Sequence, residues 1–139
     1  MNRNAFSLLA GGLLCAALPA SAHHSFAAEY DAQKPIKITG TVTKVEWMNP
    51  HIWFYVDVTD ENGKVTTWGF SGGPPGMLMR RGINKDVLKI GDTIIVEGFR
   101  AKDNSNNASG GNVTFADGRK VFAGSAEDAA PRNSESKKD

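Results

Sequence analysis

The apolar residues of one stretch, residues 40–58, constrain the fold of this chain more than any other feature. Up to Val42 the apolar residues alternate with polar ones, which is the period of a half-buried β-strand. After Lys44 the apolar positions, Val45 and Trp47, have the opposite parity. Such a phase slip inside one strand indicates a β-bulge or a sharp bend, and a bent strand can serve both halves of a small closed barrel.

A second strand is predicted at residues 51–59, after a corner fixed by Pro50. Its alternation assigns one face to the core: Ile52, Phe54, Val56 and Val58. The opposite face, which we expect to point outward, holds His51, Trp53, Tyr55 and Asp57. Residues 60–63, Asp-Glu-Asn-Gly, are a hairpin signal and predict a third strand at residues 64–71.

The rest of the chain shows a break rich in glycine and proline, one short helix, three further strands and a polar loop. These are residues 72–76, residues 77–81, the strands 93–99, 112–115 and 120–122, and the loop 101–111, which we expect to be mobile. The last two strands flank Asp117-Gly118, a second hairpin signal. The order predicts an all-β fold, a small five- to six-stranded OB-like barrel with one short helical insertion. An open SH3-like barrel is the alternative.

Residues 1–22 have the features of a signal peptide, with Arg3 before an apolar run and a small-residue cleavage pattern that ends at Ala22. The run is shorter than the roughly 20 residues that span a bilayer, so we expect no stable membrane insertion after cleavage. The sequence therefore predicts a periplasmic protein. Its predicted parts are the signal peptide 1–22, an N-terminal arm 23–35, the barrel 36–124 and a disordered tail 125–139.

Composition narrows the function classes. The single cysteine, Cys15, lies in the signal peptide, so the mature chain has no disulfide and no thiolate site. The chain has 16 basic and 15 acidic residues, and losing Arg3 balances them. Because nucleic-acid binders are usually basic, this balance argues against that role. We also predict no enzymatic activity, because the sequence fixes no two of its candidate carboxylates at a working distance: Glu46, Asp57 and Glu97.

The first candidate site is a copper site. Cleavage after Ala22 would leave a free α-amine on His23 beside His24, and amine and imidazole nitrogens suit Cu(II). Either the amine and ring of His23, or the amine, the His24 amide and the His24 ring, would bind the ion, with His51 completing the set. The alternatives are a solvated arm for the first two histidines and a polar strand cap with one hydrogen bond for His51.

The second candidate site is an aromatic face made of Trp53, Tyr55 and Trp68. OB-type barrels often bind ligands on such a face by stacking against aromatic rings. This would make the protein a metal-free interaction module for a peptide, a glycan or a protein partner. The alternative is that these side chains only cover the core.

Several motifs occur together in this chain: residues 23–26 (His-His-Ser-Phe), 40–47 (Gly-Thr-Val-Thr-Lys-Val-Glu-Trp), 49–51 (Asn-Pro-His), 63–68 (Gly-Lys-Val-Thr-Thr-Trp) and 88–92 (Leu-Lys-Ile-Gly-Asp). The set resembles domain-of-unknown-function family 6152, a family of small exported bacterial proteins, over residues 23–124. The resemblance implies an exported single domain with a small β-barrel, and it implies no activity, substrate or cofactor. One departure is Gly-Phe-Ser at residues 69–71, where such proteins often have an acidic residue.

Overall fold

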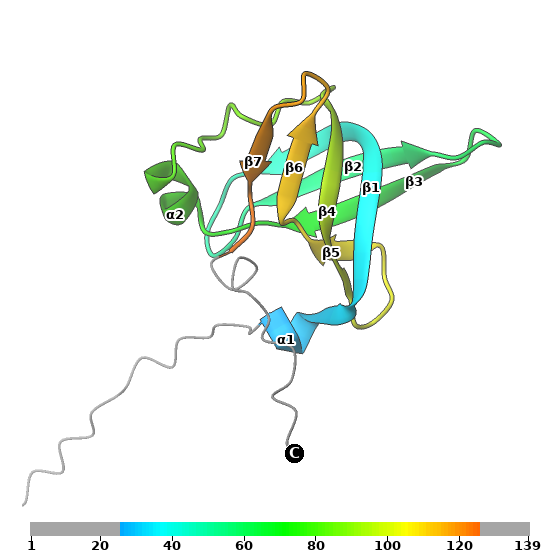
Figure 1. Cartoon of the computed structure of the whole chain (residues 1–139), viewed down its shortest axis with the longest axis horizontal. Coiled ribbons are helices and arrows are strands. Elements are labelled where there is room, and N and C mark those ends of the chain that lie inside the picture. Colours follow the sequence, from blue (N-terminus) through cyan, green and yellow to red (C-terminus); the bar gives the residue numbers. More distant parts are fainter. Residues whose placement is uncertain (1–25, 126–139) are drawn as a thin grey trace, which may run out of the picture.

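The computed structural model describes residues 26–125, and Figure 1 shows the arrangement of the helices and strands in this part of the chain. The helices are α1 (Phe26–Glu29) and α2 (Pro75–Arg80). The strands are β1 (Tyr30–Glu46), β2 (Trp53–Thr59), β3 (Val65–Ser71), β4 (Thr93–Ala101), β5 (Asn107–Ser109), β6 (Asn112–Phe115) and β7 (Lys120–Phe122). The predicted signal peptide, His23, His24 and nearly all of the predicted tail lie outside the described residues.

The long strand β1 is bent, with a register shift in each of its pairings, and it pairs with two neighbours. Its second half runs antiparallel to β2, and its first half runs antiparallel to β4. The register with β2 shifts between Val42 and Lys44, which leaves Thr43 as the extra residue of a bulge. The bulge predicted from the phase slip is thus confirmed. Gly40 allows the two strands to approach here, because a Cβ atom at this position would lie 2.3 Å from the carbonyl oxygen of Asp57.

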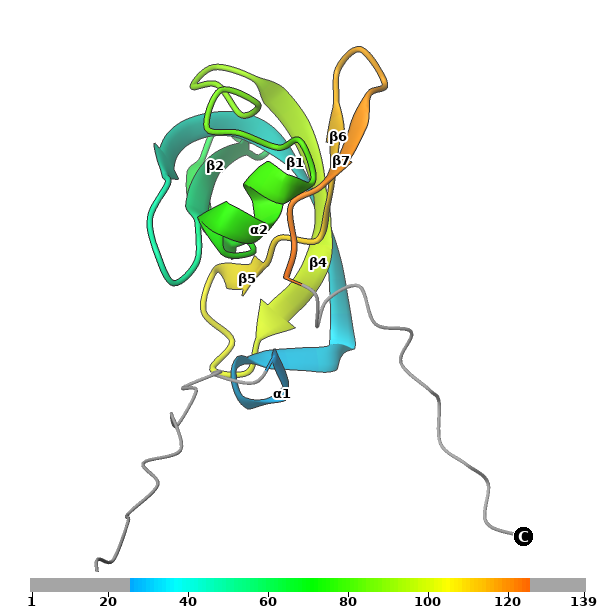
Figure 2. The same cartoon turned by 90° about the vertical axis from the view of Figure 1, so that its left-hand side faces the viewer.

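Five strands close the barrel, in the order β1-β2-β3-β5-β4, with β4 pairing back onto β1. The β3–β5 pair is parallel and the other pairs of the ring are antiparallel. With α2 inserted between β3 and β4, this confirms the predicted all-β, OB-like barrel. Figure 2 shows α2 across one end of the barrel, where its Leu78 is fully buried in the core.

The core lies inside this ring and is built from the alternating inward residues of the strands. Phe54 of β2 and Phe70 of β3 are both fully buried, and their rings stack at 5.3 Å. Burying each such side chain stabilises the fold by about 1.5–3 kcal/mol. Val58, which was predicted to belong to the core, is half-exposed. It lies near the end of the β2–β3 hairpin that projects beyond the barrel in Figure 1.

Strand β1 starts earlier than predicted. It begins at Tyr30 rather than at Ile36, so it includes residues 30–35 of the predicted arm. Tyr30 is buried and pairs with Ala101 of β4, while Phe26 of α1 packs edge-on against Phe99 at 5.7 Å. The residues between Tyr30 and Ile36, Asp-Ala-Gln-Lys-Pro, have no apolar alternation, so the sequence gave no sign of this part of the strand.

The predicted loop 101–111 contains a strand, β5, and is not a mobile loop throughout. Its sequence, Asn-Ala-Ser, has no apolar alternation, so periodicity gave no signal. Tertiary pairing holds it in place: the Gly69 N–H donates to the Asn106 carbonyl at 2.9 Å, and the Gly110 N–H donates to Ser71 at 2.7 Å. Strands β6 and β7 form the predicted second hairpin, with the predicted bounds, and extend the sheet beyond β4.

Candidate functional site

His51 lies just before β2 and is held by the backbone of the β3–α2 connection. Its Nδ1 atom lies 3.0 Å from the carbonyl oxygen of Gly72. A carbonyl oxygen can only accept, so Nδ1 carries the proton and Nε2 has a free lone pair when the ring is neutral. The hydrogen bond agrees with the polar cap, and the free Nε2 leaves a ligand role open. Within residues 26–125, no three histidine, cysteine or carboxylate side chains are placed to hold a metal ion.

The outer face of β2 carries two stacked rings. The rings of Trp53 and Tyr55 are 6.5 Å apart, with an angle of 24° between their planes. The Tyr55 hydroxyl donates to a carboxylate oxygen of Glu46 at 3.1 Å, and the Lys44 ammonium lies 5.2 Å from the centre of the Tyr55 ring. Lys44 also pairs with Glu46 at 2.6 Å. These contacts fix the orientation of Tyr55, and with it the aromatic surface.

The protonation states of this group follow from the same contacts. Hydrogen bonds from Lys44 and then Tyr55 hold the pKa of the Glu46 carboxyl below its usual value. Burial, and then the hydrogen bond to Glu46, raise the pKa of the Tyr55 hydroxyl. The hydrogen bond to Glu46 raises the pKa of the Lys44 ammonium. At neutral pH the group therefore consists of a carboxylate, an ammonium and a neutral phenol.

Trp68 does not belong to the outer face, so the prediction of one face with three aromatic residues is wrong in this respect. Trp68 pairs with Val56 across the hairpin and thus points to the core side. Its ring stacks on Phe70 at 6.4 Å and is covered by the Arg100 guanidinium at 5.4 Å. The sequence already indicated this orientation, because Trp68 and Phe70 are two residues apart in β3 and therefore lie on the same face.

Across the hairpin from Tyr55 lies Gly69, which leaves room for a polar side chain. A Cβ atom at residue 69 would lie 2.6 Å from the side-chain oxygen of Asn107 and 3.3 Å from the Tyr55 ring. The Asn107 amide therefore lies beside Tyr55, over the bare backbone of Gly69. Asn107 stood in a predicted loop, and only the parallel pairing of β3 with β5 brings it to the aromatic face.

Trp53 forms one wall of a cavity of about 350 Å³, which we call the Trp53 pocket. The other walls come from α1, the start of β1, the end of β4 and the connection from β4 to β5. The polar and aromatic side chains of its lining are Glu29, Tyr30, Trp53, Lys102, Asp103, Ser105 and Asn107. Sequence reasoning identified only Trp53 among them.

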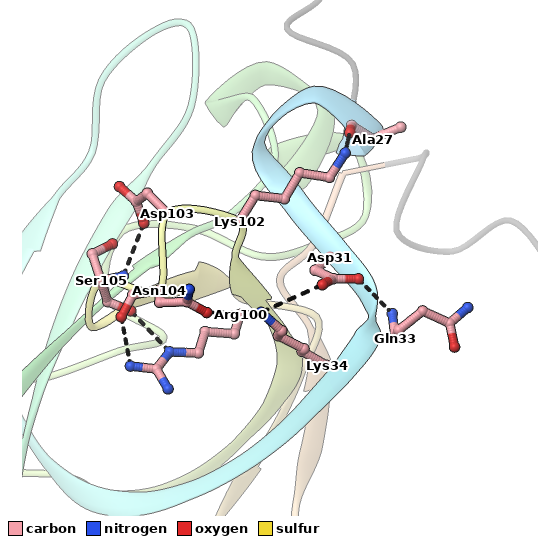
Figure 3. A network of polar contacts seen from close by, with 9 residues as sticks. All are labelled: Ala27, Asp31, Gln33, Lys34, Arg100, Lys102, Asp103, Asn104 and Ser105. Atoms are coloured by element: carbon pink, nitrogen blue, oxygen red, sulfur yellow. Dashed lines mark hydrogen bonds and ion pairs between the residues drawn. The ribbon is translucent and has the colours of Figure 1, made fainter.

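Three contacts hold α1 against the barrel and so form this pocket. The Tyr30 hydroxyl hydrogen-bonds to the Ser71 hydroxyl on β3. The backbone N–H of Lys102 donates to the carbonyl oxygen of Glu29 at 2.9 Å. The Lys102 ammonium donates to the carbonyl oxygen of Ala27, as Figure 3 shows. The wall made by α1 is thereby tied to both β3 and β4.

The connection from β4 to β5 is also ordered by hydrogen bonds (Figure 3). The Arg100 guanidinium donates to the carbonyl oxygens of Asn104 at 2.6 Å and Ser105 at 3.1 Å. An oxygen of Asp103 accepts the Ser105 N–H at 2.9 Å, and hydrogen bonds from Ser105 lower the pKa of the Asp103 carboxyl. Asp103 therefore stands at the pocket as a carboxylate. The density of asparagine, serine and aspartate here is the sequence signal for such turns.

Two other cavities are slightly larger, about 390 Å³ each. One is a groove beside β4 with Phe99 and Phe122 in its lining, and the other is a polar hollow that includes Asp92 and Asp117. Neither contains a residue of the predicted aromatic or copper site. The Trp53 pocket includes Trp53, an outward-facing residue of β2 in the predicted aromatic face, so it is the candidate site.

The fold and this outer face define a small all-β barrel protein with a polar, aromatic pocket. The chain belongs to the family of unknown function DUF6152, whose model matches residues 10–111. The match includes the complete five-stranded ring and ends before β6. A comparison with curated proteins gives no match. Among the described residues, no helix has the length and apolar character needed to cross a membrane.

Proposed function

We propose that this chain is an exported binding protein that holds its ligand in the Trp53 pocket. Residues 1–22 support export, because they have the features of a signal peptide. The observation that carries the binding role is the position of Trp53. This large aromatic side chain faces away from the core and forms a wall of a cavity of about 350 Å³, a volume in the range of small-ligand sites.

Hydrogen bonds and an ion pair hold the segments around the pocket in place, and this supports the proposal. Tyr55, which stacks against Trp53 outside the lining, is fixed by Glu46 and Lys44. Helix α1 is tied to the barrel through Tyr30 and Lys102. A site that is already formed loses less conformational entropy when its ligand binds. The pocket is therefore organised as binding sites are, with a rigid aromatic wall and polar groups along the rim.

A binding role rather than a catalytic one is proposed because the candidate carboxylates are held separately. Each has its own partner on the barrel surface: Glu46 with Lys44, Asp57 with Thr67 and Glu97 with Lys37. General acid–base chemistry needs groups that converge on one reacting atom. The described residues offer no such convergence of these three.

A thermal-shift screen of the mature chain tests this proposal. The ligand set would contain peptides, saccharides and small metabolites, and a bound ligand raises the melting temperature by mass action. Ligands of the pocket should stabilise the parent and the control Ile90→Ala, which truncates an apolar side chain that is 73% exposed and outside the pocket. They should not stabilise Trp53→Ala. Equal stabilisation of all three proteins would overturn the proposal.

Copper binding is the second candidate function, and the hydrogen bond of His51 favours it. Metal-binding histidines commonly donate their second ring nitrogen to a carbonyl group, which fixes the ring and its tautomer. His51 makes such a bond to Gly72 at 3.0 Å. Here the α-amine and the rings of His23 and His24 would supply the other nitrogen ligands, and these residues lie outside the described part of the chain.

A Cu(II) titration of the exported protein tests this second candidate, after intact mass has established that His23 is the first residue. Tight binding of one ion should weaken when an extra residue precedes His23, because that removes the free amine from its place. It should also weaken in His51→Ala. Unchanged affinity in both variants would assign the histidines to the solvated arm and the polar cap.

A further inference from the structure

We infer that the Trp53 pocket takes a neutral saccharide. This inference rests on the proposed function, because it names the class of ligand for the same pocket. It follows from three properties of the pocket. These are its aromatic wall, an amide with unused hydrogen-bonding groups, and cations that already donate hydrogen bonds within the protein.

The first property is a flat wall that a sugar ring can stack against. Trp53 supplies this wall, and the ring of Tyr55 stacks beside it, with the ring centres 6.5 Å apart and an angle of 24° between the planes, which holds the indole in place. The face of an aromatic ring is electronegative, which favours contact with the weakly positive C–H groups of a pyranose ring. Within residues 26–125 the Trp53 indole N–H has no hydrogen-bond partner, so it remains a donor for a hydroxyl group.

The second property is an amide placed beside this wall with hydrogen-bonding capacity left over. Asn107 donates one N–H to the Ser105 hydroxyl at 3.2 Å. In the described part of the chain its side-chain oxygen accepts no hydrogen bond, and its second N–H donates none. An amide offers a donor and an acceptor side by side, which matches adjacent sugar hydroxyls. Asp103, held as a carboxylate, adds a further acceptor.

The third property is that the cations around the pocket are already engaged (Figure 3). Lys102 donates to Ala27, Arg100 donates to Asn104 and Ser105, and Lys34 donates to the side chain of Asn104 at 2.7 Å. The lining itself carries two carboxylates, Glu29 and Asp103, against the one ammonium of Lys102, so it disfavours an anionic ligand such as a phosphate or a nucleotide. A flat neutral molecule with hydroxyl groups therefore fits the wall and the rim better.

A substitution at Gly69 tests whether the Asn107 amide contributes to binding and leaves the fold intact. Alanine at residue 69 would place its Cβ 2.6 Å from the Asn107 oxygen, and the end of that side chain can swing away. The Cβ would also lie 3.3 Å from the Tyr55 ring, which must shift by a few tenths of an ångström, so Gly69→Ala should lower the melting temperature only slightly while it moves the amide. Trp53→Ala removes the wall itself.

The experiment is a titration of the ¹⁵N-labelled mature chain with three neutral probes: maltotriose, cellotriose and the trimer of N-acetylglucosamine. At least one should shift the Trp53 indole and Asn107 amide signals and saturate. Affinity should fall at least about tenfold in Trp53→Ala, the loss typical of an aromatic stacking partner. It should fall about threefold or more in Gly69→Ala and stay unchanged in Ile90→Ala.

The failure of this inference differs from a failure of the proposed function. If no sugar moves these signals but acetylated trilysine amide does, in a manner that Trp53→Ala abolishes, the pocket binds and the saccharide class is wrong. If neither moves them, and the thermal-shift screen yields no ligand that depends on Trp53, both proposals are overturned. Sugar binding that survives Trp53→Ala at full affinity would also overturn the assignment to this pocket.

Discussion

Gly98 lies where β4 passes closest to β5, and its replacement by alanine tests whether this approach closes the barrel. A Cβ atom at residue 98 would lie 1.7 Å from the carbonyl oxygen of Ser109 and 2.9 Å from its carbonyl carbon. Non-bonded carbon atoms pack best at about 3.5–4.0 Å. Because the obstacle is backbone, it cannot rotate away, so the two strands must separate.

The expected cost follows from what this separation disturbs. The Phe99 N–H donates to the Ser109 hydroxyl at 3.0 Å, and Arg100 pairs with Ala108 in the ladder between β4 and β5. Overpacking costs about 1–3 kcal/mol and a lost hydrogen bond about 0.5–1.5 kcal/mol, so Gly98→Ala should lower the free energy of unfolding by about 2–4 kcal/mol. For a domain of about 100 residues, each kcal/mol corresponds to roughly 4–8 °C in melting temperature.

Thermal and urea unfolding followed by circular dichroism would measure this change. Gly76→Ala is the matched control, because it adds the same methyl group in α2, where the nearest atom would be 3.6 Å away. Since alanine favours a helix over glycine by about 1 kcal/mol, the control should be as stable as the parent or slightly more stable. A Gly98→Ala protein within about 0.5 kcal/mol of the parent would refute the argument for close approach.

Three further changes test the packing and the charges of the barrel. Phe54→Ala removes a fully buried ring and should cost about 3–5 kcal/mol in urea unfolding; a cost below about 1 kcal/mol would contradict its place in the core. The lowered pKa of Glu46 means that its contribution to stability is present above the pKa of the unfolded chain and is lost as the pH falls through the folded pKa. Lys44→Met should raise this pKa in an NMR titration of the carboxyl, and an unchanged value would reject the ion pair as its cause. Tyr30→Phe should cost about 0.5–1.5 kcal/mol, because it removes the bond to Ser71. It should also speed hydrogen exchange of the Lys102 N–H, which donates to Glu29 of α1, and unchanged exchange there would show that the bond to Ser71 does not hold α1.

The barrel could be predicted from the sequence because apolar and polar residues alternate along its strands and so distinguish the buried face from the outer face. The phase slip between Val42 and Lys44 identified the bulge, and residues 60–63 and 117–118 identified two hairpins. These signals are local, since a bulge or a tight turn is specified by neighbouring residues. Closure of the ring then followed from a bent first strand with two partners.

The pocket could not be predicted in the same way, because it depends on contacts between distant segments. Its walls come from residues 28–30, residue 53 and residues 101–107, and periodicity does not relate these segments to one another. Asn107 reaches the aromatic face through the pairing of three small or polar residues with β3. Trp68 was assigned to that face although its pairing with Val56 turns it toward the core.

The N-terminal end of the chain contributes to both proposed sites, so both depend on where the predicted signal peptide is cleaved. Helix α1 supplies a wall of the Trp53 pocket. His51 lies two residues before Trp53, just before β2 begins. His23 lies three residues before Phe26, so at most about 10 Å of extended chain separates a cleaved terminus from this helix. Cleavage after Ala22 would therefore determine both the nitrogen donors available for copper and the chain that borders the pocket. A protein that keeps its signal peptide or carries an N-terminal tag lacks the free amine of His23 and adds chain beside the pocket, so both sites are tested on the mature chain.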